Sequence, residues 1–212
     1  MKAFQIELKL NQDWDLTNKK INTNSSDEQL MSFLQKGSDS AFSILYERYS
    51  NRILFFMFKM LRNDEAKAQD FTQDIFIKVI ESAHQFKTNK SFKTWIFTIA
   101  ANHCKNHFRS VKHFADIDRE AGALTYAVDH GKSMDQKLFQ KRLSIEVDKL
   151  ALHYRQTFVL RYHEELKIKE IAEIMDCPIG TVKSRLNHTI NHLGEKLQVF
   201  KSLSDNFKLK EN

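Results

Sequence analysis

The sequence has few of the residues that interrupt helices or cross-link chains. Its 212 residues include five glycines, one proline and two cysteines. Few glycines and prolines mean few obligatory turns, so helices can run long. The two cysteines, Cys104 and Cys177, lie far apart in the sequence. Two thiols do not make a disulfide framework, and we therefore expect a reducing compartment.

Long apolar segments are missing as well. The most apolar run, ILFFMF at 53–58, is far shorter than the roughly 20 residues that a membrane-spanning helix needs. The amino terminus, MKAFQIELKLNQDW, has no apolar core of the signal-peptide type. A composition of 42% hydrophobic and 28% charged residues is typical of a globular protein. We expect a cytoplasmic protein with no direct membrane insertion.

The usual motifs of catalysis are not found either. There is no Ser/His/Asp arrangement, no glycine-rich phosphate loop and no convincing pair of acids. His103 and His107 are one helical turn apart with Cys104 beside them, but no second pair of ligands follows at a spacing typical of zinc. We expect neither an enzyme nor a bound metal or other cofactor.

Apolar residues recur at the three- and four-residue spacing of amphipathic helices in two parts of the chain. The first part starts near Asp27 and contains four expected helices, with Gly37 ending the first, a new helix starting near Asp64, and Ser91 capping the fourth. The second part starts near Asp135 and contains four more. The expected fold is all-α, with two small helical domains joined by a flexible linker, the carboxy-terminal one a helix-turn-helix.

This pattern divides the chain into five segments. We expect an amino-terminal extension at 1–24, a first helical domain at 25–112, a linker at 113–134, a second helical domain at 135–200 and a tail at 201–212. The extension has no assigned role. Its alternating apolar residues from Phe4 to Leu10 hint at a short strand, although a flexible tail is the favoured interpretation.

The segment EIAEIMDCPIGTVKSRLNHTINHL, at 170–193, has the pattern of a helix-turn-helix. Ala172 is small enough for a close crossing, and Pro178 suits the first residue of the second helix. A buried stripe is expected along that helix from Val182, Leu186 and Ile190. The polar residues left outside it are Thr181, Lys183, Ser184, Arg185, Asn187 and His188. These types can donate to phosphates and base edges in a major groove, although an ordinary hairpin with a solvated face has the same pattern.

No acidic residue lies between Glu81 and Asp116, in a chain of net charge +6. The basic residues there are Lys87, Lys90, Lys93, Lys105, Arg109 and Lys112. Aromatic residues interleave with them, and cations beside flat apolar rings are what single-stranded nucleic acid requires. The alternative is that the aromatics are core. We expect this for Phe92, whereas Trp95 fits either role and Phe86 is expected to be exposed with the loop at 87–90.

The preceding helix is acidic. Its acidic residues are Asp64, Glu65, Asp70, Asp74 and Glu81. Asp74 and Lys78 are spaced for an intrahelical ion pair, which stabilises a helix by only about 0.3 kcal/mol. Such a helix does not favour DNA binding but suits a protein partner, although a solvated face explains the charge equally well.

Three segments together resemble the bacterial extracytoplasmic-function sigma factors of the sigma-70 family. They are AQDFTQDIFIKVI at 68–80, FKTNKSFKTWIFTIAANHCKNHFRS at 86–110, and the run from LALHYRQTF to HTINHL at 150–193. The resemblance covers about Asp27 to Leu197 without the linker. It implies a sigma-two domain at 25–112 and a sigma-four domain at 135–200. Asp176 stands where the family usually has glycine, and aspartate tolerates the left-handed conformation that this turn needs.

The resemblance also implies functional residues. Docking on the clamp helices of the largest subunit of core RNA polymerase is implied for Asp70, Gln73, Asp74, Ile75 and Lys78. Binding and opening of the minus-ten element is implied for Phe86, Lys87, Asn89, Lys90, Ser91, Lys93, Trp95, Asn102 and Arg109. Reading of the minus-thirty-five element is implied for Thr181, Lys183, Ser184, Arg185, Asn187 and His188. The implied partners are core polymerase (clamp helices and the flap of the second subunit), promoter DNA and an anti-sigma factor, which is expected to be membrane-associated.

Two other functions are compatible with parts of this pattern. A stand-alone helix-turn-helix regulator would bind duplex DNA without polymerase, but would not need the acid-free aromatic stretch. A nucleic-acid enzyme would need a carboxylate cluster to hold metal, and the basic stretch contains no acid. We favour a promoter-specificity subunit that binds promoters weakly or not at all when free, because a linker between two small surfaces supplies avidity only on polymerase.

Overall fold

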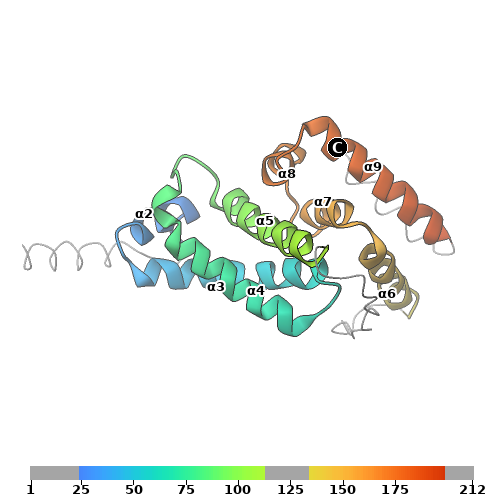
Figure 1. Cartoon of the computed structure of the whole chain (residues 1–212), viewed down its shortest axis with the longest axis horizontal. Coiled ribbons are helices and arrows are strands. Elements are labelled where there is room, and N and C mark those ends of the chain that lie inside the picture. The colour runs from blue at the N-terminus through green and yellow to red at the C-terminus, as the bar shows by residue number, and fades with distance from the viewer. Residues whose placement is uncertain (1–23, 113–133, 199–212) are drawn as a thin grey trace, which may run out of the picture.

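A computed structural model describes residues 24–112 and 134–198, and all regular secondary structure in these ranges is helical (Figure 1). The helices are α2 (Asp27–Leu34), α3 (Asp39–Met60), α4 (Glu65–Glu81), α5 (Phe92–Lys112), α6 (Met134–Lys149), α7 (Leu152–Tyr162), α8 (Ile168–Ile174) and α9 (Ile179–Lys196), with a short 3-10 helix, η1, at Ala83–Gln85. The all-α prediction is confirmed. The predicted amino-terminal extension, linker and tail lie wholly or almost wholly outside the described residues, as does the hint of a strand. Within the described ranges, no helix is long and apolar enough to cross a membrane.

Side-chain caps account for where the first four helices begin. A Ser or Asp oxygen accepts a hydrogen bond from the backbone N–H three residues later, which typically stabilises a helix by about 1 kcal/mol. These caps are Ser26 on Gln29 (3.2 Å), Ser38 on Ala41 (3.3 Å), Asp64 on Lys67 (3.1 Å) and Ser91 on Thr94 (3.2 Å). Gly37 follows α2 with φ +86°, a left-handed conformation that glycine adopts without strain. The predicted boundaries at Gly37, Asp64 and Ser91 are confirmed.

The first half of the molecule is built around α3, which packs against α2, α4 and α5. Leu45, Ile53 and Met57 of α3 are fully buried. Phe56 meets Phe97 of α5 edge-to-face, with ring centroids 5.5 Å apart. Burying an apolar side chain of this size contributes about 1.5–3 kcal/mol. This core therefore fixes α4 and α5 against α3 and against each other.

The second half ends in the predicted helix-turn-helix, formed by α8 and α9. Ala172 is 9% exposed at the crossing, and its carbonyl accepts a hydrogen bond of 3.1 Å from the N–H of Cys177. Asp176 has φ +47°, so the expected left-handed turn is present. The prediction for Pro178 is wrong by one residue. Pro178 has ψ 148° and precedes α9 as its cap, because this extended conformation lies outside the helix that Ile179 begins.

The two halves pack against each other. α5 contacts α8, and α3 contacts α7 (Figure 1). Arg155 of α7 is 2% exposed and donates to the carbonyl of Met60 at the end of α3 at 3.0 Å. Other contacts across the junction are Lys59 Nζ to Ser144 Oγ (2.7 Å), Asn63 Nδ2 to Asp148 Oδ2 (2.7 Å), Arg52 Nε to Glu164 Oε2 (2.9 Å) and Gln156 Nε2 to the Ala101 carbonyl (3.4 Å). The halves thus share an interface, which the sequence did not predict.

Candidate nucleic-acid and protein interfaces

The amino-terminal half of α9 presents the polar face that the sequence predicts. Val182 and Leu186 are buried, at 0% and 6% exposure. The predicted reading residues all have solvent access: Lys183, Ser184, Asn187 and His188 are exposed, and Thr181 and Arg185 are half-buried. Arg185 reaches back toward the turn, with Nη1 3.7 Å from the Cys177 sulfur. The helix therefore carries hydrogen-bond donors on one accessible side.

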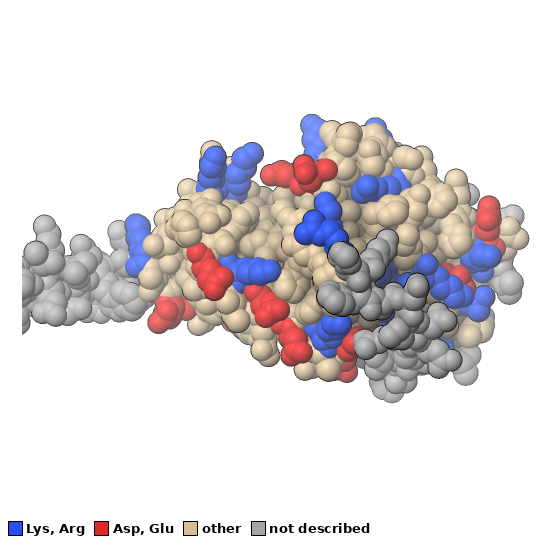
Figure 2. Space-filling model, viewed as in Figure 1, with Lys and Arg blue, Asp and Glu red and all other residues tan. Residues whose placement is uncertain are grey.

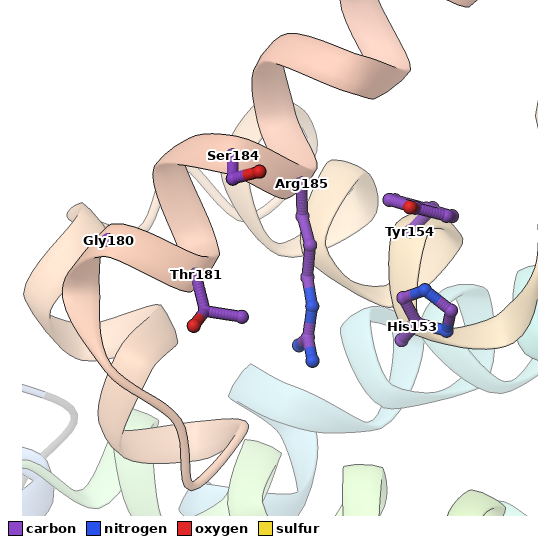
Figure 3. A pocket seen from close by; sticks show the side chains of 6 residues that line it. All are labelled: His153, Tyr154, Gly180, Thr181, Ser184 and Arg185. Atoms are coloured by element: carbon purple, nitrogen blue, oxygen red, sulfur yellow. The ribbon is translucent and has the colours of Figure 1, made fainter.

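A pocket of about 540 Å³ lies between this side of α9 and the start of α7. Its lining residues are His153, Tyr154, Gly180, Thr181, Ser184 and Arg185. Figure 3 shows Arg185 extending from α9 with Thr181 on one side and with His153 and Tyr154 of α7 on the other. Sequence reasoning assigned no role to His153 and Tyr154, because only the packing of α7 on α9 brings them to this face.

The α7 residues of the pocket interact with α9. The Tyr154 ring stacks on that of His188, with centroids 4.5 Å apart and planes 28° apart. Burial lowers the pKa of His153, and the positive charge of Arg185 lowers this pKa further. The His153 ring is consequently neutral near pH 7, and an anion beside it would favour its charged form.

The acid-free stretch forms a second accessible surface, on α5 and the loop before it. The exposed members of the predicted set are Lys87, Asn89, Lys90, Ser91, Asn102 and Arg109. Lys93 is half-buried, and its Nζ donates to the carbonyl of Glu164, in the second half of the molecule, at 2.6 Å. Burial and then the Arg52 charge lower the pKa of Lys93. Lys93 therefore already serves the contact between the halves.

The expectation that Phe86 is exposed is wrong. Its side chain is 4% exposed and meets Phe92 and Trp95, with ring centroids 6.0 and 5.2 Å away. Its carbonyl accepts a hydrogen bond of 2.8 Å from Nε2 of Gln35. The aromatic ring is drawn into the core because it can pack against two others there. Trp95 is half-buried, so it lies both in this cluster and at the surface.

The third surface is the outer face of α4. Acidic side chains form a diagonal row over this helix in Figure 2, and Asp70, Gln73 and Asp74 are exposed. The prediction of Ile75 as a surface contact is wrong: Ile75 is fully buried, because it belongs to the stripe that faces α3. Ile77 and Ile80 point outward instead, at 53% and 50% exposure. They are as apolar as Ile75, and only the packing of α4 on α3 separates the two faces.

Asp74 and Lys78 interact through a histidine and not as the predicted direct pair. Lys78 Nζ lies 2.8 Å from Nδ1 of His103, and an Asp74 carboxylate oxygen lies 3.5 Å from Nε2. Because an ammonium only donates, Nδ1 accepts and the neutral ring carries its proton on Nε2, toward Asp74. Burial and then the charge of Lys78 lower the pKa of His103, and Asp74 opposes them. The ring thus bridges α4 to α5.

We expect this bridge to make stability depend on pH. The unfolded His103 ring titrates near pH 6.5, whereas the lowered pKa of the folded ring resists protonation. Below that pH the unfolded state therefore binds more protons, and stability is lost as the pH falls. The Tm of His103→Gln should drop less than that of the wild type between about pH 7.5 and about pH 5.5. Other histidines with a lowered pKa remain in both proteins, and equal drops would contradict this role.

The candidate metal ligands on α5 do not converge. His103 faces α4, whereas the buried Cys104 sulfur contacts that of Met57 at 3.5 Å. Burial raises the pKa of Cys104 to about 12, which keeps it a thiol. Across 24–112 and 134–198, no group of three or more His, Cys, Asp or Glu residues could hold a metal ion.

Comparison with known proteins identifies the two halves. Sigma-70 region 2 matches residues 45–114, and Sigma-70, region 4 matches residues 146–193. The RNA polymerase sigma-H factor of Pseudomonas aeruginosa is 30% identical over 186 residues, which cover 83% of this chain and 96% of that protein. The ECF RNA polymerase sigma factor SigW of Bacillus subtilis is also 30% identical, over 78% of this chain and 93% of its own length.

Solved structures show the same fold. The sigma factor RpoE of Bartonella quintana, in complex with the anti-sigma factor NepR, has a TM-score of 0.65 at 22% identity and covers 74% of this chain and 97% of that chain. CnrH, in complex with the cytosolic domain of CnrY, has a TM-score of 0.63 at 20% identity, over 82% of this chain and 99% of that chain. Both sigma-70 regions match this chain, and the two relatives match it over nearly their whole length. The chain therefore belongs to the sigma-70 family, among its ECF RNA polymerase sigma factors.

Proposed function

We propose that this chain is a promoter-specificity subunit that binds core RNA polymerase, recognises the minus-thirty-five and minus-ten elements and helps to open the DNA. The observation that carries the proposal is the presence of three separate accessible surfaces of suitable chemistry. The surface on α4 combines acidic and apolar side chains. The surface on α5 and the loop before it is basic and contains no acid, and the surface on α9 is rich in hydrogen-bond donors. A stand-alone DNA-binding regulator needs only the last of them.

Each surface has its own task in this proposal. The α4 face, with Asp70, Asp74 and Ile77, docks on the clamp helices of the largest polymerase subunit, and the second half of the chain meets the flap of the second subunit. The loop at 87–91 and the exposed side of α5 hold the unpaired minus-ten strand, with cations on its phosphates. Extruding a base costs a few kcal/mol, and its binding beside the partly accessible Trp95 offsets that cost. The accessible side of α9 reads the upstream duplex.

A protein inhibitor is part of the proposal. Two of the structural neighbours were solved in complexes, RpoE with the anti-sigma factor NepR and CnrH with the cytosolic domain of CnrY. A sigma factor that was always free would compete continually for polymerase. We therefore propose an anti-sigma partner for this chain, held at the membrane, while the chain itself acts in the cytoplasm.

The test is a gel shift combined with permanganate footprinting on DNA upstream of the protein's own operon. The arms contain core polymerase, this protein, or both. A shift with reactive thymines only when both are present supports the proposal and locates the opened bases. A specific shift by the protein alone, without reactive thymines, overturns it in favour of a stand-alone helix-turn-helix regulator.

Arg185→Ala should weaken recognition of the upstream element by about 1–3 kcal/mol if the guanidinium bonds a base edge. Arg185 lies on the accessible side of α9 and makes only a weak contact to sulfur in the protein, so its loss costs little stability. The measurement is the affinity of the polymerase complex for promoters altered at each upstream base pair. Unchanged discrimination at every upstream position would rule out a base contact.

A further inference from the structure

The pocket between α7 and α9 has the composition of an anion site. All but one of its six lining residues carry a side-chain N–H or O–H donor, and none carries a carboxylate. The donors come from two helices: His153 and Tyr154 from α7, and Thr181, Ser184 and Arg185 from α9 (Figure 3). A neutral ligand would not need two side chains able to carry positive charge on opposite walls. The composition therefore favours a negatively charged oxygen ligand.

The sixth lining residue, Gly180, leaves the pocket open at the first turn of α9. It lies in the first turn of α9 without a positive φ, so the backbone does not require glycine. A Cβ atom built on it would meet nothing within 4 Å, so packing within the described protein does not require glycine either. Glycine is also unfavourable in a helix compared with alanine. A bare backbone is useful here if a ligand outside the protein approaches it closely.

The end of the helix favours the same ligand. The cap residue of α9, Pro178, makes no side-chain hydrogen bond to the first turn. The first amide groups of a helix lack partners within the helix and bear the positive end of its dipole, which suits an anion. The donors of the pocket and the amino-terminal end of α9 therefore both favour an anion beside Gly180.

We infer that this pocket holds one phosphodiester group of the DNA backbone next to the minus-thirty-five element, clamped between His153 and Tyr154 of α7 and Thr181 and Ser184 of α9. Arg185 adds positive charge at the rim of the pocket and stays available for a base edge. The inference rests on the proposed reading of the upstream duplex by α9. A helix in the major groove has the two phosphate strands on its flanks, so the element packed beside it meets the backbone and not the base edges. Lys183 and Asn187, which lie outside the pocket lining, stay available for base edges. The α7 residues thus set the position of the reading helix on the duplex.

Two variants with matched controls test the clamp in the complete complex with core polymerase. Gly180→Ala adds only a methyl group at the expected approach of the phosphate, and His153→Ala removes a donor from the opposite wall. Gly194→Ala is the control for the first, because Gly194 also lies in α9 with open space around its Cβ position. His192→Ala is the control for the second, because it removes an imidazole from α9 outside the pocket. Each pocket variant should lower promoter affinity about tenfold, His153→Ala by losing a charge-assisted hydrogen bond and Gly180→Ala by holding the phosphate away from the end of the helix. Each control should leave the affinity unchanged.

Promoters with one uncharged methylphosphonate at each upstream phosphate in turn give the decisive comparison. The wild-type complex should lose affinity at one phosphate beside the minus-thirty-five element, and the two pocket variants should be insensitive at that same phosphate. Gly180→Ala should keep or raise its Tm, so weaker binding cannot be attributed to misfolding.

Two results would overturn the clamp. One is an undiminished methylphosphonate effect at that phosphate in both pocket variants. The other is competition for the pocket by inorganic phosphate without any position-dependent methylphosphonate effect, which means that the pocket takes a free anion and not DNA. Failure of the wild-type complex to bind or open the promoter is a separate result, which overturns the proposed function itself.

Discussion

Arg155→Ala is expected to lower the free energy of unfolding by about 3 kcal/mol. This is the typical cost of removing a buried charged group that donates hydrogen bonds to both halves of the molecule. Arg155 is 2% exposed and donates to the carbonyls of Asp148 at 2.8 Å and Met60 at 3.0 Å. Burial lowers its pKa to about 10, so the guanidinium remains charged near pH 7. Its removal leaves two carbonyls without their donor and opens space at the junction of the halves. Thermal unfolding should show a Tm lower by about 6–12 °C.

Arg142→Ala is the matched control for this prediction. The Arg142 side chain is 50% exposed and pairs with Glu146 at 3.2 Å, while Lys149 holds the same carboxylate oxygen at 3.1 Å. The Glu146 carboxylate is buried, but Lys149 keeps it paired, so loss of the exposed Arg142 end should cost less than about 1 kcal/mol. If the two variants lose the same small amount of stability, Arg155 does not hold the halves together.

Replacing Ile77 and Ile80 together by alanine is expected to weaken binding to core polymerase at least about thirtyfold. Truncating central apolar contacts of an interface typically costs about 2 kcal/mol or more. The two side chains are 53% and 50% exposed on α4, beside the exposed Asp70 and Asp74, and pack little within the protein. Their truncation should therefore change Tm very little. Affinity is measured by titrating core polymerase with labelled protein.

Ile179→Ala provides the matched control. Ile179 is 43% exposed, but it begins α9 and lies far from α4 in the chain. It should leave the affinity for core polymerase unchanged. A double variant of Ile77 and Ile80 that binds core polymerase as tightly as the wild type would show that the docking surface lies elsewhere.

Local patterns in the sequence were reliable for helices and for the face of α9. Apolar residues spaced three and four apart predicted the helices. The turn residue Gly37 and the cap residues Asp64 and Ser91 predicted where helices end and begin, because caps and turns depend on neighbouring residues. The polar side of the amino-terminal half of α9 was predicted correctly because Val182 and Leu186 are buried as expected. Farther along the helix the prediction fails, since Ile190 is half-buried and Thr189 is buried in its place. The same reasoning failed for Phe86, which follows a short 3-10 helix and belongs to no extended stripe.

Choices between two helix faces required the tertiary structure. Ile75 and Ile77 are equally apolar and only two residues apart, and the packing of α4 on α3 decides that Ile75 is buried and Ile77 exposed. His103 provides a similar case. No role was assigned to it from the sequence, where a metal site was not expected, but its position opposite α4 makes it the bridge between Lys78 and Asp74.

By itself, the sequence determined the all-helical class, the helix-turn-helix and the acid-free stretch, because these depend on spacing along the chain, and its resemblance to known sigma factors indicated the family. Only the tertiary structure decided which side chains meet across long separations in the sequence. It placed Arg155 against Met60, joined Lys93 to Glu164, and brought His153 and Tyr154 of α7 beside Arg185 of α9. The physical reason is that periodicity records which face of a helix is buried, but not which partner buries it. That partner is chosen by packing of complementary shapes and by the need to pair buried polar groups.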